Sequence, residues 1–150
     1  MTIGRVCNRR IAMADRTASI LDAAKSMEAF GERVLVVTDR NADGSLQAVG
    51  VVTDREITAF VARGGDPRRD SLQDIMRTGI GFVTEADDLF ETVRWMHQNQ
   101  LREAIVHCEN GALAGIVTLD QLCGAIAGDI SADVVCAPEG NAGGDRARLH

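Results

Sequence analysis

The chain has 150 residues, 45% of them hydrophobic, and a formal net charge of −6 at pH 7. This length and composition allow a buried core, and the acidic balance with scattered basic residues argues against nucleic-acid binding. Aromatic residues make up only 3% of the chain, and no apolar run reaches the ~20 residues of a membrane span. The start lacks a secretory signal, so we expect a cytoplasmic protein whose four cysteines stay reduced.

The first half of the chain predicts a strand, a helix, two strands and a second helix. The expected elements are a strand at 11–14, a helix at 20–30, strands at 34–37 and 48–52, and a helix from 53 or 54 to about 62. Thr17 or Ser19 is the expected N-cap of the first helix, and Gly31 is placed to end it. The dense apolar strands are typical of a sheet with both faces covered.

The second half predicts the same order of elements after a polar, Pro-containing join at 66–71. The expected elements are a helical turn at 71–76, a strand at 82–83, a helix from 88 to about 99, strands at 104–106 and 113–117, and a helix from 120 to about 128. Residues 137–150 contain few apolar side chains, and we expect a disordered tail there.

The two halves repeat one phrase. Gly50-Val51-Val52-Thr53-Asp54-Arg55-Glu56-Ile57 is echoed by Gly115-Ile116-Val117-Thr118-Leu119-Asp120-Gln121-Leu122. Two copies of one small unit predict an α/β fold in which the repeats pack sheet to sheet about a pseudo-twofold axis, because one three-stranded unit cannot easily cover both sheet faces alone. The predicted organisation is a first repeat at 4–65, a linker at 66–73 and a second repeat at 74–130.

With its ordered motifs, the chain resembles a tandem pair of cystathionine-β-synthase-type (CBS) domains, also called a Bateman module. The resemblance rests on the repeated phrase, on Val6-Cys7-Asn8-Arg9 and Asp74-Ile75-Met76, which open the two repeats, and on the connector 61–67. It implies a non-catalytic regulatory module of a stand-alone bacterial type. Such modules bind AMP, ADP, ATP or S-adenosylmethionine between the repeats, form homodimers through their helices and act on an effector protein.

The candidate ligand-binding residues lie where a strand meets a helix N-terminus, a place that favours anions. The set there is Thr53, Asp54, Arg55, Glu56, Thr118, Asp120 and Gln121, and Arg102, just before a strand of the second copy, completes it. The Thr hydroxyls and the Arg side chains suit phosphate oxygens. In the family's motif the closing carboxylate takes the ribose hydroxyls; Glu56 matches it in the first copy. Gln121 replaces it in the second, unless a rotated helix start brings Asp120 there. The first site is therefore expected to be the more competent.

Two alternatives remain open at this point. Thr53 and Thr118 could be helix caps and nothing more, in which case the chain is a structural or dimerisation module with degenerate ligand sites. An enzyme is disfavoured, since no nucleophile-and-base set and no P-loop is present in the sequence. A metal site is disfavoured as well, because His97 and His107 lie in different elements without a partner at ligand spacing. No cofactor is required by this interpretation.

Overall fold

The computed structural model describes residues 1–134, with side chains described as far as residue 128. The predicted tail at 137–150 lies outside the described residues. The elements are η1 (Ile3–Arg5), β1 (Ala12–Asp15), α1 (Ile20–Phe30), β2 (Val34–Arg40), β3 (Leu46–Thr53), α2 (Asp54–Ala62), η2 (Leu72–Asp74), β4 (Gly81–Thr84), α3 (Leu89–Gln98), β5 (Glu103–His107), β6 (Leu113–Thr118) and α4 (Leu119–Val134), where η marks a 3₁₀ turn.

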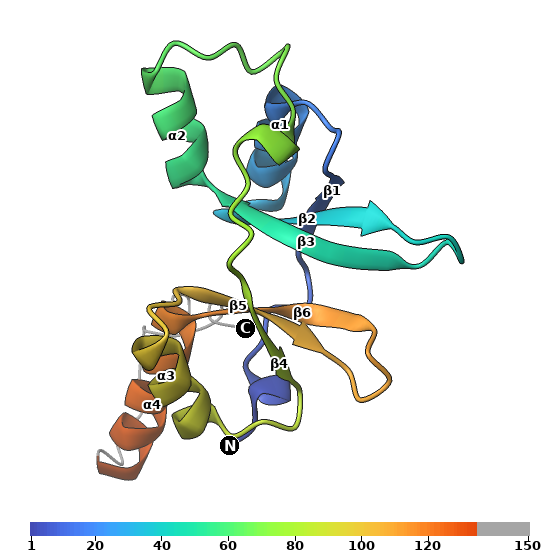
Figure 1. Ribbon diagram of the computed structural model, residues 1–150. Coiled ribbons are helices and arrows are strands. Elements are labelled where there is room, and N and C mark those ends of the chain that lie inside the picture. The colour runs from blue at the N-terminus through green and yellow to red at the C-terminus, as the bar shows by residue number, and fades with distance from the viewer. Residues whose placement is uncertain (135–150) are drawn as a thin grey trace. The chain divides into compact units, whose positions relative to one another are not determined.

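Two three-stranded sheets carry the fold, in the orders β1-β2-β3 and β4-β5-β6. In each sheet the first strand pairs parallel with the second, and the second pairs antiparallel with the third. Both antiparallel pairs slip register at matched places, between Val37 and Thr38 and between Val106 and His107. The predicted α/β order of strand, helix, strand, strand, helix is confirmed in both copies (Figure 1).

The chain divides into two compact units. The first-repeat unit is Arg10–Ile80, and the second-repeat unit combines Met1–Arg9 with the residues from Gly81 onward. The start of the chain therefore belongs with the strands of the second sequence repeat. Hydrogen bonds hold it there: the Ile3 and Gly4 N–H groups donate to the carbonyls of Asp87 and Glu85, both at 2.9 Å.

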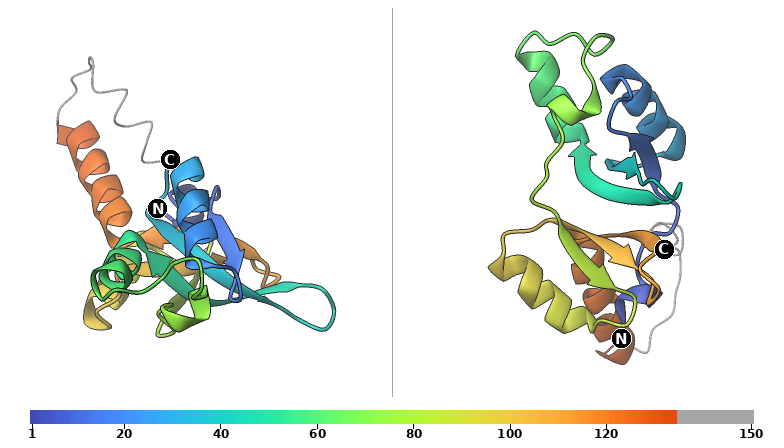
Figure 2. Two further views of the ribbon diagram at one scale, coloured as in Figure 1. Left: turned by 90° about the horizontal axis from the view of Figure 1, so that it is seen from above. Right: turned by 45° about the vertical axis from the view of Figure 1, so that its right-hand side comes forward.

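In each unit the two helices lie on one face of the sheet (Figures 1 and 2). The core of the first-repeat unit joins residues of α1 to alternate residues of β2, and includes Ala23, Met27, Leu35 and Val37. The core of the second-repeat unit is built in the same way. Its members are Ile3, Val6, Cys7, Val83, Leu89, Met96, Ala104, Val106, Val117 and Leu122. Three of these ten residues come from the first nine of the chain, so that segment is part of the core.

The helix α1 shows how local sequence sets an element's ends. The Ser19 hydroxyl accepts the N–H of Asp22 at 3.1 Å, which makes Ser19 rather than Thr17 the N-cap. Gly31 follows the last turn with a φ of 67°, a left-handed conformation that glycine adopts at little cost. The predicted helix at 20–30 is confirmed with both of its ends.

Several elements are longer than the sequence predicts. The strand β2 continues to Arg40, and its partner β3 already begins at Leu46. Thr38, Asp39 and Arg40 still pair with the opposite strand although their side chains are polar. The helix α4 passes through Gly128 to Val134. Nothing lies within 4 Å of a Cβ built at Gly128, so this glycine neither terminates the helix nor marks a close approach. No helix within residues 1–134 is long and apolar enough to cross a membrane.

Candidate ligand-binding sites at two strand-to-helix junctions

The junction between β3 and α2 is closed by a capping box. Thr53 is the N-cap, and its hydroxyl oxygen accepts the N–H of Arg55 at 3.2 Å. The Glu56 carboxylate reaches back and accepts the Thr53 N–H at 2.6 Å through Oε2, which also receives the Thr53 hydroxyl proton in a short hydrogen bond. The sequence motif thus brings Thr53 and Glu56 together, and their first role is to satisfy each other.

The junction between β6 and α4 has the same construction. The Thr118 N–H donates to Oε1 of Gln121 at 2.9 Å, and the Gln121 N–H donates to the Thr118 hydroxyl at 3.2 Å. Gln121 is therefore the structural counterpart of Glu56. Asp120 is an exposed residue one position earlier, where the first-repeat unit has Arg55. The alternative in which a rotated helix start brings Asp120 into the capping position is not what the structure shows.

In each unit a short crossing segment, centred on Arg77 in the first-repeat unit and on Asn8 in the second-repeat unit, pairs with the third strand of the sheet just before the junction. Arg77 and Val51 exchange two backbone hydrogen bonds of 2.9 and 3.0 Å, and Asn8 and Ile116 exchange two of the same lengths. Arg77 and Asn8 are thus equivalent positions. The repeated glycines make these bridges possible. A Cβ on Gly50 would lie 2.9 Å from the Arg77 carbonyl oxygen, and one on Gly115 would lie 2.4 Å from the Asn8 carbonyl oxygen.

The first junction is rich in charge. Nε of Arg77 lies 2.9 Å from Oε1 of Glu56, and their side chains are 44% and 16% exposed. Glu56 is thus a mostly buried carboxylate whose charge is balanced by a specific cation. Arg33 and Asp54 form a looser pair, with 4.0 Å between Nε and Oδ2, in which both side chains are more than half exposed. Such a pair adds little stability because solvent screens it.

Arg102, chosen from the sequence as a phosphate contact, occupies the loop before β5. Its carbonyl accepts the Leu119 N–H at 2.8 Å, as the Arg33 carbonyl accepts the Asp54 N–H at 3.1 Å, and its side chain is exposed. Arg33 is therefore its equivalent in the first-repeat unit. Sequence reasoning missed both Arg33 and Arg77. Alignment of the two copies could have found Arg33, because it stands in the first copy where Arg102 stands in the second.

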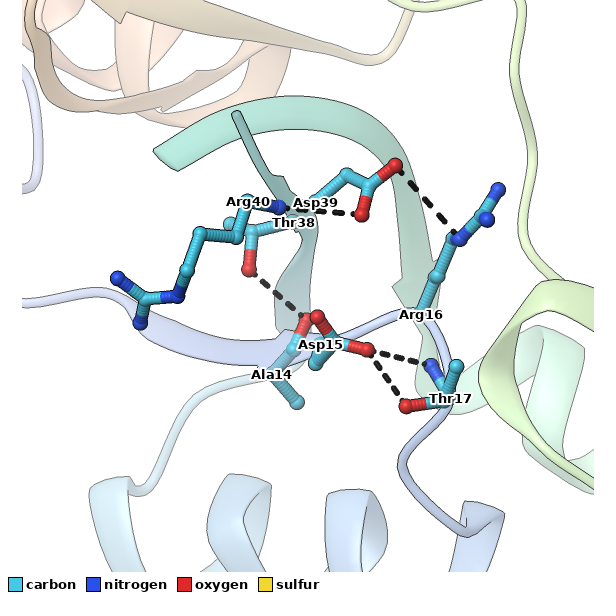
Figure 3. Close-up of polar contacts among 7 residues, drawn as sticks. All are labelled: Ala14, Asp15, Arg16, Thr17, Thr38, Asp39 and Arg40. Carbon is cyan, nitrogen blue, oxygen red and sulfur yellow. Dashed lines mark hydrogen bonds and ion pairs between the residues drawn. The ribbon is translucent and has the colours of Figure 1, made fainter. Parts of the chain in front are cut away.

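Figure 3 shows a second polar group, at the far end of β1 and β2 from the junction. Asp15 accepts the hydroxyl and the N–H of Thr17 at 2.6 and 2.9 Å, and these bonds lower the pKa of the Asp15 carboxyl. Nε of Arg16 lies 3.6 Å from Oδ2 of Asp39. These contacts close the turn that leads into α1, and they involve none of the sequence-predicted site residues.

The equivalent place in the second-repeat unit holds two thiols beside an ion pair. Arg9 and Glu85 pair at 2.5 Å, which lowers the pKa of the Glu85 carboxyl. A hydrogen bond with Glu85 raises the pKa of the Cys108 thiol, and burial raises the pKa of the Cys7 thiol. Both cysteines are free, and within residues 1–128 no group of His, Cys, Asp and Glu is arranged to hold a metal ion. Raised pKa values keep both thiols protonated at neutral pH.

Several side chains of the second-repeat unit have packing roles. His107 stacks on Phe82 with 5.3 Å between ring centroids, and Met96 is fully buried in the core. Trp95 packs against the same core and covers Gly81, where a Cβ would lie 2.6 Å from the indole.

A surface hollow of about 410 Å³ lies beside the first junction, where Arg33, Asp54 and Ile57 line it together with residues of α1.

Comparison with known proteins assigns the family. Residues 3–63 and 72–128 each match the model of the CBS domain. The chain is a tandem pair of CBS domains. The two matches together cover most of the sequence, and the repeated phrase of the third strand and following helix lies inside both of them.

One relative of this CBS pair is known from its sequence similarity. MK0525 of Methanopyrus kandleri, an uncharacterized protein, is 25% identical over 124 residues, 81% of this chain and 61% of that protein. The chain therefore spans less than two thirds of this relative's length.

Among solved structures, the CBS domain pair of MJ0100, in complex with 5′-methylthioadenosine and S-adenosyl-L-methionine, has a TM-score of 0.71 at 18% identity, covering 86% of this chain and 98% of that chain. The CBS domain of a bacterial CNNM/CorC family Mg²⁺ transporter, in complex with ATP, has a TM-score of 0.71 at 21% identity, covering 85% and 88%. Both likenesses support the fold.

Proposed function

We propose that this CBS pair is a regulatory module that binds adenosine derivatives at its two strand-to-helix junctions and acts on an effector protein without catalysing a reaction. AMP, ADP, ATP and S-adenosylmethionine are the candidate ligands. One observation carries the proposal: both copies close a buried strand with a Thr-centred cap at the N-terminus of a helix. Proteins of the same fold, in the complexes described above, hold methylthioadenosine, S-adenosylmethionine or ATP.

The chemistry of the first junction suits a phosphate group. Backbone N–H groups in the first turn of α2 and the positive end of its dipole favour an anion. Arg55, the second residue of this helix, is exposed and offers a guanidinium fork at the same end. Glu56 already accepts from Thr53 and Arg77, but a carboxylate has about four lone-pair positions, which leaves it able to accept a ribose hydroxyl.

The regulatory step would be a change in the relative orientation of the two repeats on ligand binding, read by the effector or by a second copy of the chain. A ligand can produce such a change only if it binds one arrangement more tightly than the other. Small-angle scattering of the protein with and without saturating ligand tests this step. Identical scattering curves would argue against it.

Calorimetric titration of the full chain with AMP, ATP and S-adenosylmethionine tests the binding itself. We expect saturable binding and an increase in the unfolding temperature with at least one of them. Arg55→Ala should weaken binding of the phosphorylated ligands by about ten-fold, the effect of one charge-assisted hydrogen bond. Arg63→Ala is the matched control, because Arg63 is an exposed arginine at the opposite end of α2.

A structural or dimerisation module is the second candidate, and the capping boxes favour it. The Thr53 hydroxyl and the Glu56 carboxylate are both used inside the protein, as a cap without ligand would require. Under this alternative none of the three ligands binds or stabilises the protein. Light scattering would still detect a dimer, and its mass would not respond to nucleotide.

A further inference from the structure

A short motif from the connector between the repeats recurs after the last helix. The connector motif is Gly64-Gly65-Asp66-Pro67-Arg68-Arg69, and the tail motif is Gly143-Gly144-Asp145-Arg146-Ala147-Arg148. Both have two glycines, then an aspartate and, three positions after the aspartate, an arginine. The connector motif follows α2, and the tail motif follows α4, the equivalent helix of the second repeat. The internal repeat of the chain therefore extends to the residue that follows each closing helix.

In the first-repeat unit the connector motif caps the N-terminus of α1. The Asp66 side chain accepts the N–H of Arg68 at 3.0 Å and lies 3.8 Å from Nε of Arg69, which closes the motif into a turn. The Pro67 carbonyl accepts the N–H of Leu21 at 2.9 Å. The first N–H groups of a helix have no acceptor inside the helix, and the connector motif supplies one of the missing acceptors.

The start of α3 has only part of this cap among residues 1–134. The Leu89 N–H donates to the Met1 carbonyl at 2.9 Å. This bond is the counterpart of the one from Ile20 to Asp70 at 3.1 Å in α1. The next N–H in α1 is the one that bonds to the connector motif, but in α3 the next N–H, that of Phe90, has no backbone acceptor among residues 1–134. The Phe90 side chain is 56% exposed, so this helix end lacks a cover.

A hollow of about 450 Å³ lies beside the same helix end. Its lining includes the rings of Phe82 and Trp95 and the carboxylates of Asp87, Asp88 and Glu91. Of these three carboxylates, and within residues 1–128, only that of Glu91 has an arginine as ion-pair partner, at 3.3 Å. Aromatic faces beside an excess of negative charge suit a guanidinium, which stacks on rings and donates to carboxylates.

The two helix starts and the two motifs differ in a matched way. The N-cap of α1 is the neutral Ser19, and the N-cap of α3 is the charged Asp88. The fourth position of the motif changes in the complementary direction, from Pro67 in the connector motif to Arg146 in the tail motif. Because the Pro67 carbonyl is the group that bonds to α1, the tail motif carries its additional cation at the position expected next to α3.

The chain before the tail motif is long enough for this contact. The helices α2 and α4 begin at equivalent residues and contain 9 and 16 residues, so α4 extends about 10 Å further. Residues 135–142 separate Val134 from Gly143 and can span up to about 26 Å when extended. The tail motif can therefore return to α3, which packs beside α4 (Figure 1).

We propose that the tail motif docks on the start of α3 in the same chain, as the connector motif docks on the start of α1. The Arg146 carbonyl accepts the Phe90 N–H. The Arg146 guanidinium lies in the hollow, against the ring of Trp95 and beside the carboxylate of Asp87. This docking replaces the disorder that composition predicts for residues 137–150, and it does not depend on the proposed function.

Amide hydrogen exchange of the full chain, followed by NMR, tests the backbone contact. Asp145→Ala removes the residue that closes the turn, and it should speed exchange of the Phe90 amide by about ten-fold while the Leu21 amide stays as in wild type. Asp66→Ala, the matched variant of the connector motif, should do the reverse. Glu139→Ala lies before the tail motif and should alter neither amide. If Asp145→Ala leaves the exchange of Phe90 at the wild-type rate, the tail motif does not cap α3.

Acrylamide quenching of Trp95 fluorescence tests the side-chain contact, because Trp95 is the single tryptophan and lines the hollow. Arg146→Ser should raise the quenching constant, and about 0.5 M NaCl should bring the wild type toward the variant, since salt screens the pairing with the carboxylates. Arg63→Ser removes an exposed arginine of the first-repeat unit and should leave the constant unchanged. A constant unaffected by Arg146→Ser would overturn the placement of Arg146 in the hollow. Protection of Trp95 that grows with protein concentration would show that the tail motif of a second copy is the occupant, and would overturn docking within one chain.

Discussion

Replacement of Gly115 by alanine tests whether the repeated glycine is required by the crossing segment. A Cβ at this position would lie 2.4 Å from the carbonyl oxygen of Asn8, a contact that real Cβ atoms do not make. That oxygen is also the acceptor of the Ile116 N–H at 3.0 Å, so the methyl group pushes on one half of the bridge between the segment and β6. Because the obstacle is backbone, a side-chain rotation cannot relieve it.

The expected cost combines two effects. Overpacking of a tight contact costs about 1–3 kcal/mol, and each of the two backbone hydrogen bonds of the bridge contributes roughly 1 kcal/mol. Gly115→Ala should therefore lower the free energy of unfolding by about 3 kcal/mol. Gly50→Ala should cost less, because the backbone obstacle there, the Arg77 carbonyl oxygen, lies at 2.9 Å rather than 2.4 Å, and the nearer Sδ of Met76 at 2.8 Å belongs to a flexible side chain.

Urea unfolding followed by the fluorescence of Trp95 measures this cost. Trp95 is the single tryptophan of the chain and packs in the core of the second-repeat unit, the unit that contains Gly115. Gly128→Ala is the control, because Gly128 lies in the same unit, nothing lies within 4 Å of its Cβ and its φ is not in the left-handed region. If Gly115→Ala is no more destabilising than Gly128→Ala, the crossing segment does not require this glycine.

Three further predictions concern stability. Deletion of residues 1–9 should prevent cooperative unfolding of the second-repeat unit, because it removes the fully buried Ile3 from that core; a sharp urea transition of Trp95 fluorescence after the deletion would contradict this. The pairing of Glu85 with Arg9 lowers the carboxyl pKa from 4.5, so its stabilisation is present above that pH and is lost as the pH falls through the lowered value; Glu85→Gln should flatten the acid side of the stability profile, and an unchanged profile would refute the assignment. Ser19→Ala should cost about 1 kcal/mol of thermal stability through loss of the N-cap of α1, with no change expected if the cap is dispensable.

Local pattern was enough to predict the order of elements and to reduce the N-cap of each first-repeat helix to two residues, of which the structure selects Ser19 and Thr53. Apolar spacing predicted α1 with its end at Gly31, and the placement of Thr53 before an acidic residue predicted the N-terminus of α2. These features depend on residues a few positions apart. Strand ends were predicted less well: β2 continues through Thr38, Asp39 and Arg40 because backbone pairing with β3 needs no apolar side chain.

The sequence pointed to residues that the structure brings together at the first junction, but not to all of their contacts. The sequence singled out Thr53 and Glu56, and the structure joins them, but the partner that balances the charge of Glu56 is Arg77, twenty-one residues further along the chain. Nothing in the local pattern around Glu56 points to that arginine. The choice between Asp120 and Gln121 likewise depended on the actual start of α4, which places Gln121 at the third helical position.

A repeated α/β module could be predicted from the chain alone, because hydrophobic periodicity, helix capping and repetition are local or self-referring properties of a sequence. The segments that complete each unit could not, because they depend on contacts between distant parts of the chain. Residues 1–9 join the strands of the second repeat, and the segment around Arg77 bridges the third strand of the first. The physical reason is that backbone pairing and core burial depend on which surfaces meet in space. That pairing also explains why Gly50 and Gly115 recur, and it brings Arg77 to the third strand, where its side chain pairs with Glu56.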